Sequence, residues 1–537
     1  MAVHASYQPI ISIKRTKQLL LIPLLFCIAF SSSINGANPE KAVQWGRWQH
    51  TLISEGYTEG QQVSLNVVFT NPEGKSFTTP AFTDDGKTFQ FRAAFPSPGV
   101  WRWKTICNDP NNKGLHNKTD KVKVKRYMGK NPLFKHGDLK VSDDGRYLTH
   151  ADGTPFLWMG DTGWNGPLKL TKNEWCDYVD KRIVQGFSVI QIGAKGASNG
   201  PDSPISFNQD GTIDPHFWQD LEDKIAYAND NGLFVLIVGL RSEWRDLFAK
   251  NPENQKFETY VSGRFSSFMV IFSPCFDQKY DKELNRVAEE LQKSTLHLVT
   301  QHSGTHYESN LKFRNCPSVD FCGLQSGHHL WTKKLGNAYF AARSWTLDMW
   351  NGTPVKPVIN IEAMYDEFGN NNAEHTSTRE MDVRKLGWIS WLSGSKGYSY
   401  GSQIWFFNQD STKFDFWRKV MDWPSANQMT VMRNYFESIA WWHLIPSHEL
   451  VLNQAEDETQ KMVVSQTKQK DMLLAYLPDN PVIVLDLKDY KGTMTGKWMN
   501  PLNGKNIEII QKVIPSASVT FSRPEGWEDA LLILTRQ

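Results

Sequence analysis

A short apolar stretch that ends in a carboxylate is the part of this sequence most suggestive of chemistry. Residues 357–361 have the pattern of a buried strand, and Glu362 follows them directly. In a barrel of parallel strands, the residues at the C-terminal ends of the strands form the active site. Glu362 is therefore the first candidate for a catalytic residue.

A second carboxylate follows another apolar stretch. Asp277 comes shortly after residues 268–272. Cleavage of a glycosidic bond needs two carboxyl groups, one to protonate the leaving oxygen and one to act as nucleophile or base. Asp277 and Glu362 can form such a pair. Residues 274–276 are apolar, and we expect them to raise the pKa of Asp277 by desolvation.

A barrel is the fold that the middle of the chain predicts, between residues 147 and 428. Thr171 and Glu174 have the spacing of a capping box, and Asp214-Pro215 is a typical helix start. Strands that alternate with helices in this way fit a (β/α)8 TIM barrel. A doubly wound open sheet is the alternative, but no GxGxxG loop follows the first strand. The predicted strands are 156–159, 188–192, 233–238, 268–272, 296–300, 321–324, 357–361 and 402–406.

Alternating sequences on both sides of the barrel predict two further domains. Residues 42–126 contain short segments in which apolar and polar residues alternate, separated by turns such as Asp84-Asp85-Gly86. Residues 435–537 return to this pattern, with a turn at Asn503-Gly504. We therefore expect an antiparallel β-sandwich before the barrel and another after it.

The first 36 residues have the order of a secretory signal peptide. Basic residues at positions 14, 15 and 17 precede an apolar run, 19–30, and small residues follow. Cys27 raises the alternative of a lipoprotein, but this is less favoured than secretion because Phe26 stands where a small residue is expected before a lipidated cysteine. No later segment contains about 18 apolar residues in a row, so we expect no membrane span. These features predict a secreted or periplasmic protein.

Composition excludes several classes of protein. The 59 basic and 57 acidic residues nearly balance, which argues against a nucleic-acid binder. None of the six cysteines forms a CxxC pair, which argues against a disulfide framework or zinc ribbon. The 21 tryptophans offer flat apolar faces that suit sugar rings. We expect an oligosaccharide or polysaccharide as partner, and no cofactor.

Polar and aromatic residues follow most of the predicted strands and would line a pocket. Such side chains can bind sugar hydroxyls or stack against a sugar ring. The predicted substrate-binding residues are Asp161, Trp164, Gln191, Lys195, Arg241, His302, Gln325, His328, Tyr365 and Trp405.

Three segments of the sequence resemble the apiosidase-like barrels of glycoside hydrolase family 140 and its relatives. They are residues 156–164, the strand that ends at Glu362, and residues 384–405. The first predicted sandwich resembles the one that often precedes such barrels, and the last resembles a collagen-binding-type domain that often follows. The resemblance covers nearly the whole chain after the leader.

The resemblance implies roles for three carboxylates. Asp277 would be the acid/base, Glu362 the nucleophile and Asp161 a ligand of substrate hydroxyls. One segment departs from the family pattern, because a Gly-rich or Asn-Glu-like element more often precedes the acid than the residues at 273–276. This departure bears on the acid/base assignment and on a specificity for apiose.

Three other functions compete with hydrolysis. His302 with His306, or His328 with His329, could bind a metal together with Asp161 or Glu243, although strand one lacks a His-x-His pair. A uronate lyase or dehydratase would use a histidine or tyrosine base, with Lys195 and Arg241 neutralising the acid group. A non-catalytic carbohydrate-binding protein is the third.

Hydrolysis fits the residues best. We expect a secreted enzyme, without metal, that cleaves a complex plant or algal polysaccharide with retention. Whether the anomeric configuration is retained or inverted depends on the distance between the carboxyl groups, which is about 5 Å for retention and beyond roughly 6.5 Å for inversion.

Overall fold

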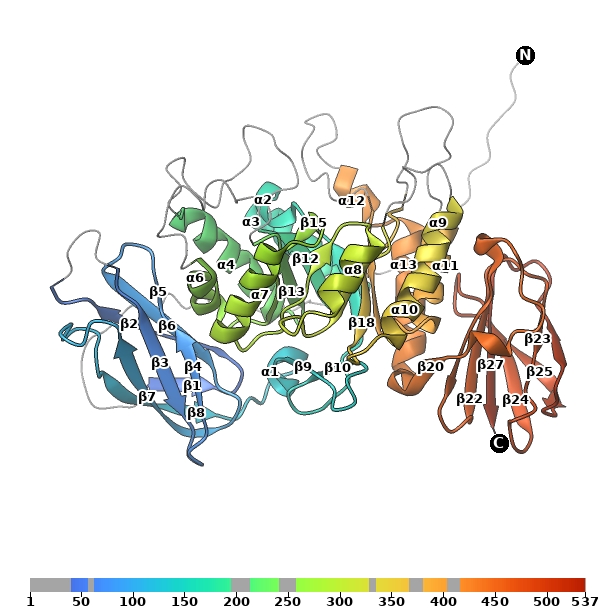
Figure 1. Ribbon diagram of the computed structural model, residues 1–537, viewed down its shortest axis with the longest axis horizontal. Helices are drawn as coiled ribbons and strands as arrows, with labels where there is room; N and C mark the ends of the chain where they lie inside the picture. Colours follow the sequence, from blue (N-terminus) through green and yellow to red (C-terminus); the bar gives the residue numbers. More distant parts are fainter. Residues whose placement is uncertain are drawn as a thin grey trace, which may run out of the picture. The chain divides into compact units, whose positions relative to one another are not determined.

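A seven-stranded parallel sheet forms the centre of the protein (Figure 1). The computed structural model describes residues 40–56, 62–194, 213–240, 257–327, 335–366, 380–402 and 416–536. Numbered as the eight predicted strands, the seven strands of this sheet follow the order 4-3-2-1-8-7-6, as neighbouring strands of a barrel would; the fifth predicted strand is not part of the sheet. In that order the strands are β14 (Val270–Ser273), β13 (Phe234–Val238), β12 (Val189–Gly193), β11 (Trp158–Thr162), β19 (Gly397–Tyr400), β18 (Val358–Glu362) and β17 (Cys322–Gln325).

The fifth predicted strand lies between β14 and the chain that enters β17. Phe272 forms a parallel bridge to Val299, and β15 (Phe276–Gln278) pairs in parallel with β16 (His302–Ser303). On the other side, the Asp320 amide donates to the Val299 carbonyl at 2.8 Å. The fold is thus mixed α/β, built on a parallel half-barrel.

Helices cover the outer face of this sheet. The capping box at Thr171 and the helix start at Asp214-Pro215 are both present. Within the described residues no helix is long and apolar enough to cross a bilayer. The helices are α1 (Pro132–His136), α2 (Gly166–Lys169), α3 (Lys172–Val184), α4 (Pro215–Asp230), α6 (Phe257–Phe265), α7 (Lys282–Ser294), α8 (Tyr307–Arg314), α9 (Leu335–Phe340), a π-helical turn (Ala341–Trp345), α10 (Thr346–Asn351), α11 (Glu380–Leu392), α12 (Phe416–Val420) and α13 (Pro424–Glu437).

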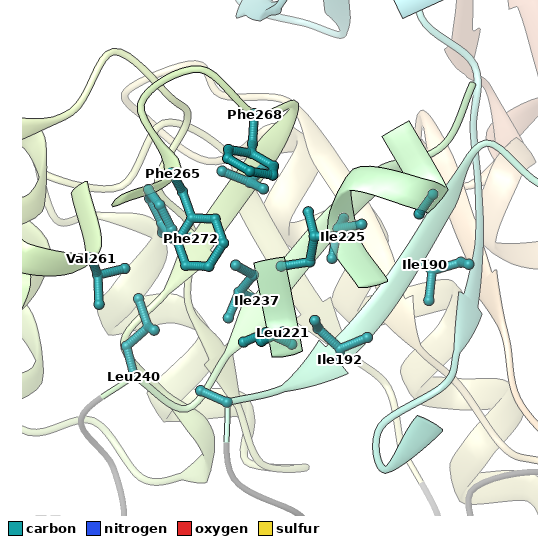
Figure 2. Packing of buried hydrophobic residues seen from close by; sticks show 14 of the residues in the cluster. Ile190, Ile192, Leu221, Ile225, Ile237, Leu240, Val261, Phe265, Phe268 and Phe272 are labelled. Atoms are coloured by element: carbon teal, nitrogen blue, oxygen red, sulfur yellow. The ribbon is translucent and has the colours of Figure 1, made fainter. Parts of the chain in front are cut away.

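The central strands are apolar on both faces because both faces are covered. Ile192 and Ile237 belong to the same buried cluster as Leu221 and Ile225 of α4, and Figure 2 shows these side chains. Their neighbours Leu236 and Val238 belong to a separate buried cluster that includes Ile361. Successive side chains of each strand therefore alternate between two buried cores, one packed against the helices and one on the inner face of the sheet.

Two of the predicted strands are displaced in the structure. The eighth strand was expected at 402–406 but is β19, Gly397–Tyr400, and residues 403–415 lie outside the described residues. The buried Ser399 interrupts its apolar pattern and hides the strand in the sequence. The first strand runs to Thr162, so that Asp161 lies within it rather than beyond it.

Two further groups of sheets precede and follow the central one along the chain. In the first, five strands and three strands share a core that includes Phe69 and Phe91. One pair departs from the antiparallel expectation, because β1 runs parallel to β8. The sheets are β1 (Glu40–Val43), β8 (Thr119–Lys125), β7 (Gly99–Cys107), β3 (Leu65–Thr70), β4 (Ser76–Pro80), and β2 (Arg47–Ile53), β6 (Thr88–Ala94), β5 (Phe82–Thr83).

The C-terminal group has six strands in one sheet and two in the other, around a core that includes Leu473 and Phe521. A short hairpin, β9 (Leu139–Val141) and β10 (Leu148–His150), precedes the central sheet. The C-terminal sheets are β20 (Leu444–Pro446), β21 (Val463–Thr467), β22 (Met472–Leu477), β27 (Ala530–Arg536), β24 (Met494–Met499), β25 (Asn506–Val513), and β23 (Val482–Leu485), β26 (Val519–Ser522). The predicted leader, 1–36, lies outside the described residues.

A buried ion pair connects α11 to the C-terminal sheets. Arg384 donates to both carboxylate oxygens of Asp529, at 3.0 and 2.9 Å. Tyr476 donates to the same carboxylate at 2.6 Å. Burial opposes the charge of Arg384, but its bond and charge interaction with Asp529 outweigh this and raise its pKa.

Replacing Arg384 by Met should lower the free energy of unfolding by about 3–5 kcal/mol, because Asp529 would keep a buried charge without its cation. Chemical denaturation measures this change. Lys293→Met is the control, since the exposed Lys293–Glu290 pair contributes about 0.5 kcal/mol or less. Equal losses in the two variants would contradict the assignment.

Candidate active site

Glu362, the last residue of β18, is held by three side chains. Gln325 Nε2 donates to Oε2 at 2.9 Å, and the Tyr365 hydroxyl donates to Oε1. His302 Nε2 lies 2.9 Å from Oε2. The Glu362 side chain is only 4% exposed. A buried carboxylate with donors on both oxygens is fixed in position and stabilised as the anion.

The ladder between β17 and β18 explains how Gln325 reaches Glu362. The register shifts between Leu324 and Gln325, so that Gln325 pairs directly with Glu362. Tyr365 lies three residues beyond the strand and is itself buried. Burial raises the pKa of its hydroxyl and the charge of Glu362 raises it further, so the hydroxyl remains a donor.

Asp277 occupies an irregular position in β15. Its φ of 54° lies in the left-handed region, and the pairing with β16 is irregular between Phe276 and Gln278. Such a conformation costs roughly 1–2 kcal/mol in a residue other than glycine, and bulges often redirect a side chain at a functional site. The Asp277 side chain is 52% exposed. Residues 274–276 therefore bury the Asp277 side chain only in part.

His302 lies between the two carboxylates. Its Nδ1 is 3.7 Å from Asp277 Oδ1, while its Nε2 is the atom near Glu362. The ring is fully buried, with the edges of Trp164 and Phe276 against it at centroid distances of 5.1 and 5.2 Å. Burial lowers its pKa, but the bond to Glu362 and the charges of Glu362 and Asp277 outweigh burial, so the pKa is raised.

The Asp277 and Glu362 carboxylates lie close together. One oxygen of Asp277 lies within 4.8 Å of one oxygen of Glu362. Retaining glycosidases keep their carboxyl groups about 5–5.5 Å apart, and inverting enzymes about 6.5–9.5 Å. The nearest oxygens of Asp277 and Glu362 therefore lie within one site.

Asp277, His302 and Glu362 also offer the donor atoms of a metal site. Both Glu362 oxygens, however, already accept bonds from protein donors, namely Tyr365 and Gln325. A metal would have to displace at least one of these bonds. The cluster therefore fits a hydrogen-bonded catalytic carboxylate better than a metal ligand set.

Four of the predicted substrate-binding residues gather at Glu362, although none of them was predicted to contact it. Gln325, Tyr365 and His302 contact the carboxylate, and the Trp164 indole donates to the Tyr365 hydroxyl. Their common feature in the sequence is a position just after an apolar stretch. Lys195, Arg241, His328 and Trp405 lie outside the described residues.

Asp161 is not part of this cluster. Its carboxylate is fully buried and accepts from Arg182 Nε at 2.8 Å and from Tyr178, both on α3. It therefore anchors α3 to β11, and its predicted contact with substrate hydroxyls stays a prediction. The extension of β11 through Thr162 places Asp161 on the helix-facing side.

Gln191 is also held away from the cluster. Its amide donates to the Ile361 carbonyl at 2.8 Å and accepts from Ser399 at 2.7 Å. These bonds connect β12 to β18 and β19 inside the sheet. Both polar atoms of Gln191 are engaged in these bonds, and its role in substrate binding stays a prediction.

Phe276 was predicted only as an apolar neighbour of Asp277, and the structure places it against His302 as well. Its ring centroid lies 5.2 Å from that of His302 and 5.0 Å from that of Trp164. Its position directly before Asp277 was the available signal. The sequence could not show that the side chain turns toward His302.

Comparison with known proteins agrees with this geometry. Residues 142–443, more than half of the chain, match the family described as "Apiosidase-like, catalytic domain". Residues 445–535 match a family named for a proposed collagen-binding domain of a collagenase. A search of curated proteins gave no match.

Solved structures share the fold. A structure titled "Glycoside hydrolase" is 22% identical, with a TM-score of 0.66, over 76% of this chain and 99% of its own. A glycoside hydrolase family 5 structure from Bacteroides vulgatus ATCC 8482 is 21% identical, with a TM-score of 0.65, over 76% and 96%. A proposed glycoside hydrolase from the same organism is 17% identical, with a TM-score of 0.68, over 92% and 100%.

Fold, paired carboxylates and comparisons together define a glycoside hydrolase. The chain belongs to the apiosidase-like family.

Replacing Tyr365 by Phe should lower kcat/KM roughly 10- to 150-fold, because a bond to a charged group contributes about 1.5–3 kcal/mol. Steady-state kinetics on any glycoside that the wild type cleaves gives the value. Tyr400→Phe is the control, since it removes another buried tyrosine hydroxyl, bonded to Ser425 at 2.9 Å. Similar losses in both variants would show that Tyr365 has no special part at Glu362.

Proposed function

We propose that the protein hydrolyses a glycosidic bond with net retention of configuration, with Glu362 as nucleophile and Asp277 as acid/base. One observation carries the proposal: a fixed, buried Glu362 carboxylate has an oxygen within 4.8 Å of an oxygen of the half-exposed Asp277. That separation suits a glycosyl-enzyme intermediate and leaves little room for a water between the groups.

Glu362 has the environment of a nucleophile. Gln325 and Tyr365 hold one oxygen each, so the carboxylate cannot rotate freely. Such pre-organisation removes part of the entropic barrier to attack on the anomeric carbon. In the first step a bond forms from Glu362 to that carbon, while Asp277 protonates the departing oxygen.

Asp277 has the access that an acid/base needs. Its exposed side chain can meet the glycosidic oxygen and, in the second step, an incoming water. The carboxylate then takes a proton from this water, which attacks the anomeric carbon and releases Glu362.

The substrate we propose is a glycan of a complex plant or algal polysaccharide, with an apioside as the first sugar to test because of the family match.

We also propose that the half-barrel completes a (β/α)8 barrel, that the flanking sheets are sandwich domains, and that the leader directs secretion. Val299, which pairs with the fourth strand and bonds to the chain before the sixth, supports closure.

Glu362→Gln should abolish turnover, and Asp277→Asn should reduce it by roughly 10²–10⁴-fold, the usual contribution of general acid–base catalysis. Activity on branched oligosaccharides is measured by mass spectrometry, and sugar binding by calorimetry. Retained binding in both variants supports the proposal.

Wild-type activity in both variants would contradict the assignment. Binding without turnover in the wild type would favour a carbohydrate-binding protein, and an unsaturated, ultraviolet-absorbing product would favour a lyase. The anomer released first, observed by proton NMR, tests retention.

Prolonged treatment with EDTA should leave kcat/KM within about twofold, because the two-carboxylate mechanism needs no metal. The treated enzyme is assayed before and after adding back Zn²⁺, Ca²⁺ or Mn²⁺. Loss of activity on chelation with recovery on one ion would instead support a metal at Asp277, His302 and Glu362.

A further inference from the structure

The exposure of Asp277 raises the question of where the acid proton is kept. Aspartic acids in water have a pKa of about 3.9 and are ionised near neutral pH. Glycosidases usually keep the proton on the acid by burying it or by placing it near another charge. Asp277 is 52% exposed, so burial is not the main device here.

His302 is the group best placed to hold that proton. Its two ring nitrogens face the two carboxylates, with Nδ1 3.7 Å from Asp277 and Nε2 2.9 Å from Glu362. Its backbone amide donates to Ser273 Oγ at 2.9 Å, and Trp164 and Phe276 pack against the ring. The imidazole is therefore held in this orientation and cannot bind bulk water.

We propose that His302 stores the proton that Asp277 gives to the leaving group, and recovers it in the second half of the reaction. The inference rests on the proposed function. His302 would act through Asp277 and would not touch the sugar, in contrast to the substrate-binding role that the sequence suggested.

The proton can be followed through both steps. First, the Nδ1–H bond of the imidazolium breaks and the proton moves to Asp277 Oδ1, then to the glycosidic oxygen as its bond to the sugar breaks. Glu362 becomes an ester, and His302 is left neutral with its proton on Nε2. In the second step the water proton moves to Asp277 and then to Nδ1, as the water oxygen displaces Glu362.

The charges around the ring favour this cycle. Among the described residues, the ionisable groups that face it are Glu362 on β18 and Asp277 on β15, and both raise its pKa. The ring therefore keeps its second proton to higher pH than an exposed histidine and loses it as pH rises through the raised value. Esterification of Glu362 removes one of the two negative charges, which makes release of the proton easier.

The distance of 3.7 Å must shorten before transfer. Catalytic hydrogen bonds are often long in a ligand-free enzyme and tighten when substrate binds. Asp277 is the partner able to move, since its side chain is half exposed while His302 is fully buried.

The leaving group provides the test. His302→Gln keeps an amide that can donate to Glu362 but cannot store a proton. On an alkyl glycoside, which needs protonation, kcat/KM should fall about 100-fold or more. On the 2,4-dinitrophenyl glycoside of the same sugar, whose leaving group needs no proton, it should fall no more than about threefold. Asp277→Asn should show the same selectivity.

His297→Gln is the matched control. His297 is also fully buried and bound to a carboxylate, with Nδ1 2.6 Å from Asp138, but it lies away from the site. Its variant should lose stability without leaving-group selectivity. Equal losses on the two glycosides in His302→Gln would show that His302 only positions Glu362, and unchanged kinetics would show no role; either result overturns the proposal.

A measurement without substrate separates this inference from the proposed function. In ¹⁵N-histidine NMR of the whole protein, the His302 signals are those missing from His302→Gln. Both ring nitrogens should be protonated at neutral pH, and Glu362→Gln should lower the pH at which the second proton is lost. A neutral ring across the pH range 5–8 overturns the proposal. If the wild type cleaves neither glycoside, the proposed function fails for that sugar, and this spectrum still decides the state of His302.

Discussion

The buried charge of Glu362 is the constraint on which the site depends. Taking a carboxylate out of water costs several kcal/mol unless donors replace the lost hydration. Here the donors are Gln325 of β17 and Tyr365 in the chain after β18, and His302 of β16 lies 2.9 Å from the carboxylate. The strand ends must therefore converge at one point, and the register shift at Gln325 is one means of achieving this.

Polar bonds inside the sheet hold β18 in the position that this convergence requires. Gln191 bridges the Ile361 carbonyl and Ser399, and the Trp158 indole donates to the same serine at 3.0 Å. These bonds connect β11, β12, β18 and β19, and one of them ends on Ile361, the residue before Glu362. Their geometry is specific in a way that apolar packing alone is not, because each buried polar atom must meet its partner.

Sequence patterns located the strands and most of the residues around Glu362, because a polar residue just after an apolar run is at a strand end in a parallel sheet. The same rule failed at Asp161, where the strand continued through Thr162 and the side chain turned toward Arg182. It also failed at β19, where Ser399 interrupts the apolar run since it is bonded to Gln191. Both failures come from long-range partners that no local pattern encodes.

The exposure of Asp277 could not be predicted from the sequence for a related reason. Its exposure depends on a left-handed backbone and an irregular pairing with β16, not on the identity of its apolar neighbours. An exposed acid can reach the substrate, but burial does not raise its pKa. In this protein the His302 ring lies between the two carboxylates, and under the proposal above the charge of Glu362 acts on Asp277 through His302. The strand ends that fix Glu362 therefore also set the conditions under which Asp277 can act.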